Sequence, residues 1–255
     1  TSISTLLAWA VLLLLPWLLG GQWLPFQLGA VTVAFAALVI SLVNGFPRVK
    51  TPMILMACLC AYTLIQVANP AYTQTWQTGL RIWSLVQENY IHWLPSSIQS
   101  GFTDASPLRF LILVLTATGV GLALMNQQDR KTLPATLILI SVSGATIALI
   151  GTVQVNFGNQ SILGIFDAKG RGLGLFFGTF LYKNQAAAFF NLAMAGSIAS
   201  FLNLASQTRS QRSNPSLLFL IFAILLLIGT VASRSRFGFV CSFPILVIFG
   251  VISIK

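Results

Sequence analysis

The chain has 255 residues, of which 56% are hydrophobic and only 7% are charged. A soluble domain carries about 25% charged residues, so this composition, with a mean hydropathy of +0.86, excludes an ordinary soluble protein. The net charge of +10 would suggest nucleic-acid binding in a soluble chain. Here the basic residues lie in the gaps between apolar runs, where membrane topology and lipid phosphates account for them, so nucleic acid is not expected as a partner.

Eight apolar segments follow one another along the chain, and none shows the ten-residue alternation of a membrane barrel. They predict an all-α fold, a polytopic membrane helix bundle in which residues 1–255 form a single transmembrane domain. Three spans are expected within 1–67 and five within 108–255. The expected spans are about 6–19, 26–43, 53–67, 108–125, 135–153, a sixth that ends near 204, 217–232 and 237–254.

Residues 68–107 are expected to form a long extracytoplasmic loop. The piece Thr75–Val86 has apolar residues at helical spacing, and tryptophans flank or lie within it. Because tryptophan favours the membrane–water interface, we predict an interfacial helical segment here.

The basic residues divide evenly between the two sides of this topology, seven on each. One set comes in pairs within short polar links, as topology signals do, and the other lies beside glycines and aromatic residues at span ends. We therefore place the paired set and both termini in the cytoplasm. The paired set comprises Arg48, Lys50, Arg130, Lys131, Arg209 and Arg212, with Lys255 on the same side.

The segment 170–190, GRGLGLFFGTFLYKNQAAAFF, is the strongest candidate for a binding site. It places Arg171, Lys183 and Asn184 close to apolar spans, where each charge costs about 2.5–3.5 kcal/mol on insertion scales. The functional interpretation is a diphosphate-binding site. The Arg171 guanidinium would bind two phosphate oxygens, the Lys183 ammonium would add a positive charge, and the Asn184 carboxamide would orient the ligand. The alternative is that these side chains snorkel at a helix end. Glycines at 172, 174 and 178 would leave room for a bulky ligand or for close helix approach.

A second cluster is Ser233-Arg234-Ser235-Arg236-Phe237-Gly238. If this turn were helical, the two arginines would face different ways and could not both contact one ligand. Arg236 is then the better binding candidate, and Arg234 is a secondary one that could equally anchor the chain in the interface.

The only histidine, His92, lies four residues after Glu88. On a helix this pair could act as a base and its orienting group, which makes His92 a weak catalytic candidate. An interfacial loop histidine is the simpler interpretation. No DxD, HExxH, CxxC, P-loop or Rossmann fingerprint is present, so the sequence supports no metal site and no cofactor.

These features together resemble the O-antigen ligase/O-antigen polymerase family. The resemblance rests on the order of short motifs in the last two-thirds of the chain. They are LPSS before the fourth span, GTVQVNFG at 151–158, a loop with Arg171, Gly178-Thr179-Phe180, Asn184 with Ala186, and Ser235-Arg236-x-Gly238.

The resemblance implies an inverting, metal-independent glycosyltransferase of the bacterial inner membrane, with the lipid bilayer and a lipid-linked glycan as partners. Such enzymes transfer a glycan from undecaprenyl diphosphate at the periplasmic face. Arg171 and Arg236 stand at matching motif positions and would bind the diphosphate. The family has Asn-His where this chain has Asn184-Gln185, and its catalytic histidine loop would follow beyond Lys255.

Two interpretations therefore stay open. The chain is a piece of a longer enzyme, or it is a shortened, non-catalytic member that serves as a structural subunit beside other membrane proteins. A small-anion transporter ranks below both, because the sequence shows no inverted repeat and no evident set of polar residues buried within the spans.

Overall fold

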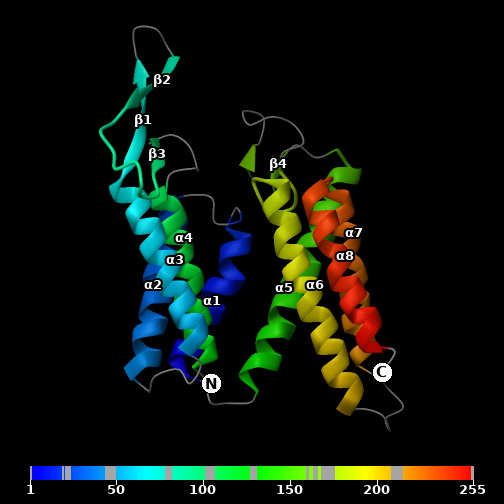
Figure 1. The fold of residues 1–255 in the computed structure, drawn as a ribbon. Helices are drawn as coiled ribbons and strands as arrows, with labels where there is room; N and C mark the ends of the chain where they lie inside the picture. Colours follow the sequence, from blue (N-terminus) through cyan, green and yellow to red (C-terminus); the bar gives the residue numbers. More distant parts are fainter. Residues whose placement is uncertain are drawn as a thin grey trace. The chain divides into compact units, whose positions relative to one another are not determined.

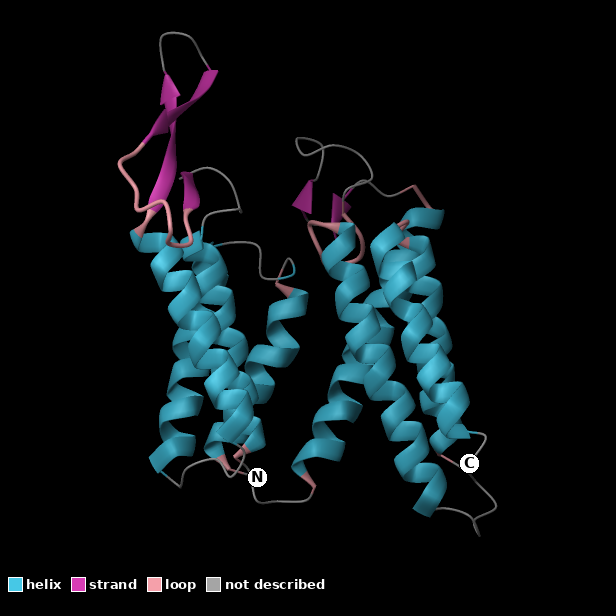
Figure 2. Ribbon diagram, in the orientation of Figure 1, coloured by secondary structure: helices cyan, strands magenta, loops and turns pink. Residues whose placement is uncertain are grey.

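The computed structural model describes residues 2–18, 20, 24–43, 50–77, 82–100, 107–126, 131–158, 161–162, 166–167, 176–207 and 215–253. Over these residues the chain is mainly helical, with eight helices and five short strands (Figures 1 and 2). It divides into two compact units. The first comprises Thr1–Ala8 and Gln27–Gln128, and the second comprises Trp9–Phe26 and Asp129–Lys255.

Each of the eight apolar segments predicted from the sequence is a helix in the described part of the chain. The helices are α1 Ile3–Trp17, α2 Leu24–Val43, α3 Lys50–Ala68, α4 Pro107–Met125, α5 Thr132–Asn156, α6 Lys183–Gln207, α7 Ser216–Ala232 and α8 Arg236–Ser253. Three of them contain stretches long and apolar enough to cross a membrane, namely Pro25–Val43, Thr132–Asn156 and Lys183–Ala205. The others form shorter apolar helices.

In the first unit, α4 packs against α3 and contacts α2 through a small residue. A Cβ added to Gly119 would lie 2.9 Å from the Ala34 carbonyl oxygen, so the two backbones approach closely here. About two turns further along both helices, the Asn126 amide donates to the Ser41 carbonyl at 2.7 Å and to its hydroxyl at 2.9 Å. These bonds hold the end of α4 against α2.

Within the loop at 68–107, the piece Thr75–Val86 is not the interfacial helical segment that the sequence predicted. Its first part is a hairpin in which β1 (Pro70–Gln77) pairs antiparallel with β2 (Ile82–Gln87). Then β3 (Ser97–Ser100) pairs parallel with the other edge of β1, which gives the order β2-β1-β3. The expectation of an all-α chain is therefore wrong in this region.

The physical reason is that Thr75–Val86 is two half-segments that pair with each other. Threonine, isoleucine, tryptophan and valine all favour strands over helices. Across the hairpin the Thr75 and Ser84 hydroxyls lie 3.1 Å apart, a cross-strand polar pair typical of a sheet face. Helical spacing of a few apolar residues was too weak a signal against this pairing.

A buried asparagine joins the sheet to α3. Asn69 follows the last residue of α3 and is 6% exposed. Its amide donates to the Ile91 carbonyl at 3.0 Å, and its Oδ1 accepts the Ile91 N–H at 2.8 Å. The loop after β2 is therefore fixed at the end of α3 by both halves of one carboxamide.

The second unit is a helical bundle in which α6 packs against α5, α7 and α8. Small residues allow the close packing: a Cβ added to Gly229 on α7 would lie 2.7 Å from the Ala148 Cβ on α5. The core is apolar and includes a group of phenylalanines. Its buried members include Ile147, Ala148, Phe177, Phe180, Phe190, Ala193, Met194 and Leu226.

Successive helices of the second unit run in opposite directions. As a result α5 ends, α6 begins, α7 ends and α8 begins at one end of the bundle (Figure 1). The short strands β4 (Ser161–Ile162) and β5 (Phe166–Asp167) pair at that same end. The candidate residues of α6 and of the turn before α8 thus belong to a common end of the unit.

Candidate functional site

The turn between α7 and α8 is not helical. Arg234 has φ of 54°, the left-handed region, and directly follows Ser233, the C-cap residue of α7. The Arg234 N–H donates to the Val231 carbonyl at 2.9 Å, as in the turn that commonly ends a helix. Because the turn is not helical, the helical spacing that would point Arg234 and Arg236 in different directions does not apply here.

Ser235 begins the next helix as its N-cap. Its Oγ accepts the Gly238 N–H at 3.1 Å, the bond from the third helical position that a capping serine makes. Ser233 and Ser235 are both buried, whereas Arg234 and Arg236 are both exposed. The two serines thus build the turn, and the two arginines project from it.

Lys183 and Asn184 form the first turn of α6, at the same end of the bundle (Figure 1). Lys183 is half-buried and Asn184 is exposed. Neither α6 nor α8 has an acidic residue in its first turn. A helix N-terminus carries a partial positive charge, and basic side chains placed there increase it. This end of the second unit therefore favours an anion.

A contact one turn below holds the beginnings of α6 and α8 together. A Cβ added to Gly238 would overlap the Cβ of Ala187, so the two helices cross at these residues. The Asn191 amide donates to the Gly238 carbonyl at 2.8 Å, and the Ser242 hydroxyl donates to the Asn191 Oδ1 at 2.8 Å. The crossing sets the spacing between the helix starts that carry Lys183 and Arg236.

Sequence reasoning missed Asn191 and Ser242, and it found no evident polar set within the spans. Asn191 is 7% exposed and Ser242 is 1% exposed, and both lie inside apolar helices. The available signal was a carboxamide in the middle of an otherwise apolar span, since such a group requires a hydrogen-bonding partner when buried. Here the partners are another helix and its backbone, which is a structural role.

Gly178 forms a tight turn that packs closely against α5. Of the two alternatives for this glycine, close helix approach therefore applies, and room for a ligand does not. It has φ of 61° and occupies the first central position of a two-residue turn between Phe177 and Phe180. Glycine is preferred there because other residues are strained at positive φ. A Cβ at Gly178 would lie 3.0 Å from Ile147 Cγ2, and the Thr179 hydroxyl donates to the Pro16 carbonyl at 2.7 Å. The turn is packed against helices, with no space for a ligand beside Gly178.

Arg171, with Gly172 and Gly174, lies outside the residues that the structure describes. Its predicted diphosphate contact therefore stays a prediction. Of the paired basic set, two members lie within the described ranges: Lys50 is the first residue of α3, and Lys131 is the N-cap residue of α5.

His92 does not form the predicted helical pair with Glu88. Residues 88–91 are not helical, because the chain leaves β2 and turns at His92–Trp93. Both side chains are exposed, and the His92 ring contacts Tyr90 edge to face at 4.4 Å between centroids. The helical spacing was the only reason to pair His92 with Glu88. Because this segment is not a helix, the structure gives no support for a base and its orienting group here.

Within the described part of the chain, no three His, Cys, Asp or Glu side chains gather where they could hold a metal ion. The candidate residues described at the α6–α8 end are one lysine, two arginines and one asparagine, which offer positive charge and amide hydrogen bonding. No protein-family model, no curated protein and no solved structure matches this chain.

The backbone at Arg234 offers a test that separates charge from conformation. A left-handed conformation costs an ordinary residue about 1–2 kcal/mol, and glycine avoids this cost. We expect Arg234→Gly to keep or raise the thermal stability of the purified protein, while Arg234→Ala, which has the same backbone cost as arginine, should leave it nearly unchanged. A stability that falls with both substitutions would mean that the arginine side chain itself holds the turn.

Proposed function

We propose that this chain is a membrane glycosyltransferase-like protein of the O-antigen ligase/polymerase type, which transfers a glycan from undecaprenyl diphosphate. The α6–α8 end of the second unit would face the periplasm of a bacterial inner membrane. Support comes from the order of the sequence motifs and from the apolar helices. The observation that carries the proposal is that Lys183, Asn184, Arg234 and Arg236 gather at one end of one bundle.

The proposed topology has eight crossings with both termini in the cytoplasm. An even number of crossings returns the chain to its starting side, and the alternating directions of α5 to α8 are consistent with this. The paired basic residues of the links would then lie in the cytoplasm, in accord with the positive-inside rule.

In the proposed reaction the acceptor hydroxyl attacks the anomeric carbon, and the bond from that carbon to the diphosphate oxygen breaks. The electron pair of this bond goes to the diphosphate, which gains negative charge. Arg236, Lys183 and the N-termini of α6 and α8 would stabilise this charge, an electrostatic contribution to lowering the barrier. Asn184 would orient the phosphate, and Arg171 would add a second guanidinium fork.

The acceptor proton requires a base, and the roles proposed for the residues of the α6–α8 end, binding and charge stabilisation, do not supply one. In the family that the chain resembles, a histidine in a periplasmic loop has that role. The proposal therefore assigns binding and charge stabilisation to the α6–α8 end, and it assigns no base to this chain.

The decisive experiment measures glycan transfer from a lipid-linked donor in proteoliposomes that contain the full-length protein. We expect Arg171→Gln and Arg236→Gln each to lower the rate by about 10²–10³-fold, the loss typical of removing one preorganised charge-stabilising group. Arg109→Gln in the first unit is the matched control, because it also removes one guanidinium, and it should keep most of the activity.

If both variants transfer glycan at the normal rate, these arginines do not hold the diphosphate. A full-length protein that shows no transfer, but co-purifies stoichiometrically with other membrane proteins, would favour the non-catalytic subunit instead.

A further inference from the structure

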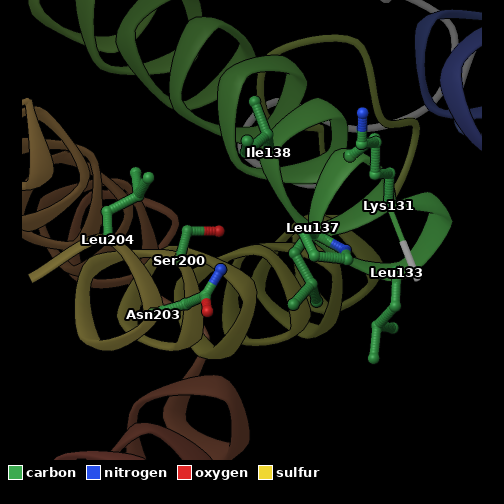
Figure 3. A pocket seen from close by; sticks show the side chains of 9 residues that line it. Lys131, Leu133, Leu137, Ile138, Ser200, Asn203 and Leu204 are labelled. Carbon is green, nitrogen blue, oxygen red and sulfur yellow. The ribbon is translucent and has the colours of Figure 1, made fainter. Parts of the chain in front are cut away.

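The other end of the second unit contains a cavity of about 600 Å³ between the start of α5 and the last turns of α6 (Figure 3). This volume lies within the range of about 300–1,000 Å³ that is typical of small-molecule sites. Most of its wall is aliphatic. The apolar lining residues include Leu133, Pro134, Leu137, Ile138 and Leu204.

Three polar side chains also line the cavity, from both helices. Lys131 comes from the start of α5, and Ser200 and Asn203 come from α6. Ser200 and Asn203 lie one turn apart on α6, across from the first turns of α5 (Figure 3). The cavity therefore combines an aliphatic wall with a small polar group and one positive charge.

Ser200 differs from four other buried helical hydroxyls of this unit. Thr136, Ser141, Ser197 and Thr230 each donate to the carbonyl four residues earlier, at 2.6 to 2.9 Å. The Ser200 hydroxyl makes no such bond and has no hydrogen-bond partner in the structure, although the residue is only 4% exposed. An unsatisfied buried hydroxyl is costly, and such groups call for a ligand or a water.

The positive charge at this end of the unit favours a ligand that carries a negative charge. Lys131 is the N-cap residue of α5, and the first turn of α5 contains no acidic side chain. The positive end of the helix dipole and the ammonium group therefore act together on the mouth of the cavity. A ligand whose anionic group lies at this mouth would place its remaining atoms against the aliphatic wall of the cavity.

We propose that this cavity binds an anionic phospholipid, with its phosphate at Lys131 and the first part of an acyl chain along Leu137, Ile138 and Leu204. The helices α5 and α6 that form it are two of the three that satisfy the length and composition of a membrane span. A basic pocket at the end of two such helices lies at headgroup depth, where anionic lipids are bound. Ser200 and Asn203 donate to phosphate or ester oxygens. The site lies at the opposite end of the unit from Arg236 and does not depend on the proposed reaction.

The test titrates the purified full chain in detergent with phosphatidylglycerol or with phosphatidylcholine of the same acyl chains, and native mass spectrometry counts bound lipid. We expect a clear preference for phosphatidylglycerol. Lys131→Gln should weaken that binding about fivefold, as expected for one basic residue near a lipid phosphate. Ser200→Ala should weaken it by a smaller factor for both lipids.

Arg109→Gln, which removes one positive charge in the first unit, should leave the preference unchanged. Ser200→Phe should weaken the binding of both lipids, because the ring takes up space beside the polar group of the cavity. A second arm adds inorganic phosphate, which should not displace the lipid because it lacks an acyl chain. Equal binding of the two lipids, normal binding by Lys131→Gln, or full displacement by inorganic phosphate would each overturn the proposal.

Discussion

Phe190→Ala should destabilise the second unit more than any other single truncation in the core. Phe190 on α6 is 0% exposed, and its ring lies 5.7 Å from that of Phe177 and 6.5 Å from that of Phe180. Removal of a fully buried phenylalanine ring leaves a cavity and costs about 3–5 kcal/mol. The two rings that lose their partner belong to the turn around Gly178, so this turn should loosen as well.

Thermal unfolding of the purified protein in detergent measures this loss. Phe243→Ala on α8 is the matched control, since it removes the same ring from a position that is 65% exposed. We expect a large drop in Tm for the first variant and little change for the second. Similar drops for both would indicate that the α8 surface is covered by protein and that the core does not centre on Phe190.

Gly238→Ala should force α6 and α8 apart at the crossing that holds the candidate site. The new methyl group would overlap the Cβ of Ala187, an atom that is bonded directly to the α6 backbone and cannot rotate away. Overpacking of this kind costs about 1–3 kcal/mol. The bond of 2.8 Å from the Asn191 amide to the Gly238 carbonyl would lengthen with it.

Gly250→Ala on the same helix provides the control, because no atom lies within 4 Å of its added Cβ. Alanine is the better helix former by about 1 kcal/mol, so this variant should unfold at the same or a higher temperature. Gly238→Ala should unfold at a lower temperature and, in the glycan transfer assay, should reduce the rate through the altered spacing of Lys183 and Arg236. Normal stability and rate in Gly238→Ala would mean that the crossing is free to adjust.

The helices could be predicted from the sequence because the signal for each is strong and local. Long apolar runs are interrupted by polar links such as NQQDRKTLP and ASQTRSQRSNP, where backbone groups can be solvated. The hairpin after α3 could not be predicted in the same way. Its strands are short, and its stability comes from pairing between residues such as Thr75 and Ser84, which is a non-local property.

The candidate site shows the same division. Sequence reasoning selected Arg234, Arg236 and Lys183 because charged residues beside apolar spans are costly, and it selected Asn184 as a polar neighbour of Lys183. It could not find Asn191, whose role depends on a carbonyl of another helix 47 residues away. For Gly178 it left two alternatives open, space for a ligand and close helix approach, and only the packing against Ile147 of α5 favours the second.

By itself the sequence determined that this is an apolar, basic chain of eight helical segments, because hydrophobicity acts on each segment separately. The tertiary structure alone decided which basic residues share one end of the second unit. It also placed Gly238 at the crossing of α6 and α8, and it left the Ser200 hydroxyl without a hydrogen-bond partner. These properties depend on distances between segments far apart in the chain, and such distances are set only when the helices pack against one another.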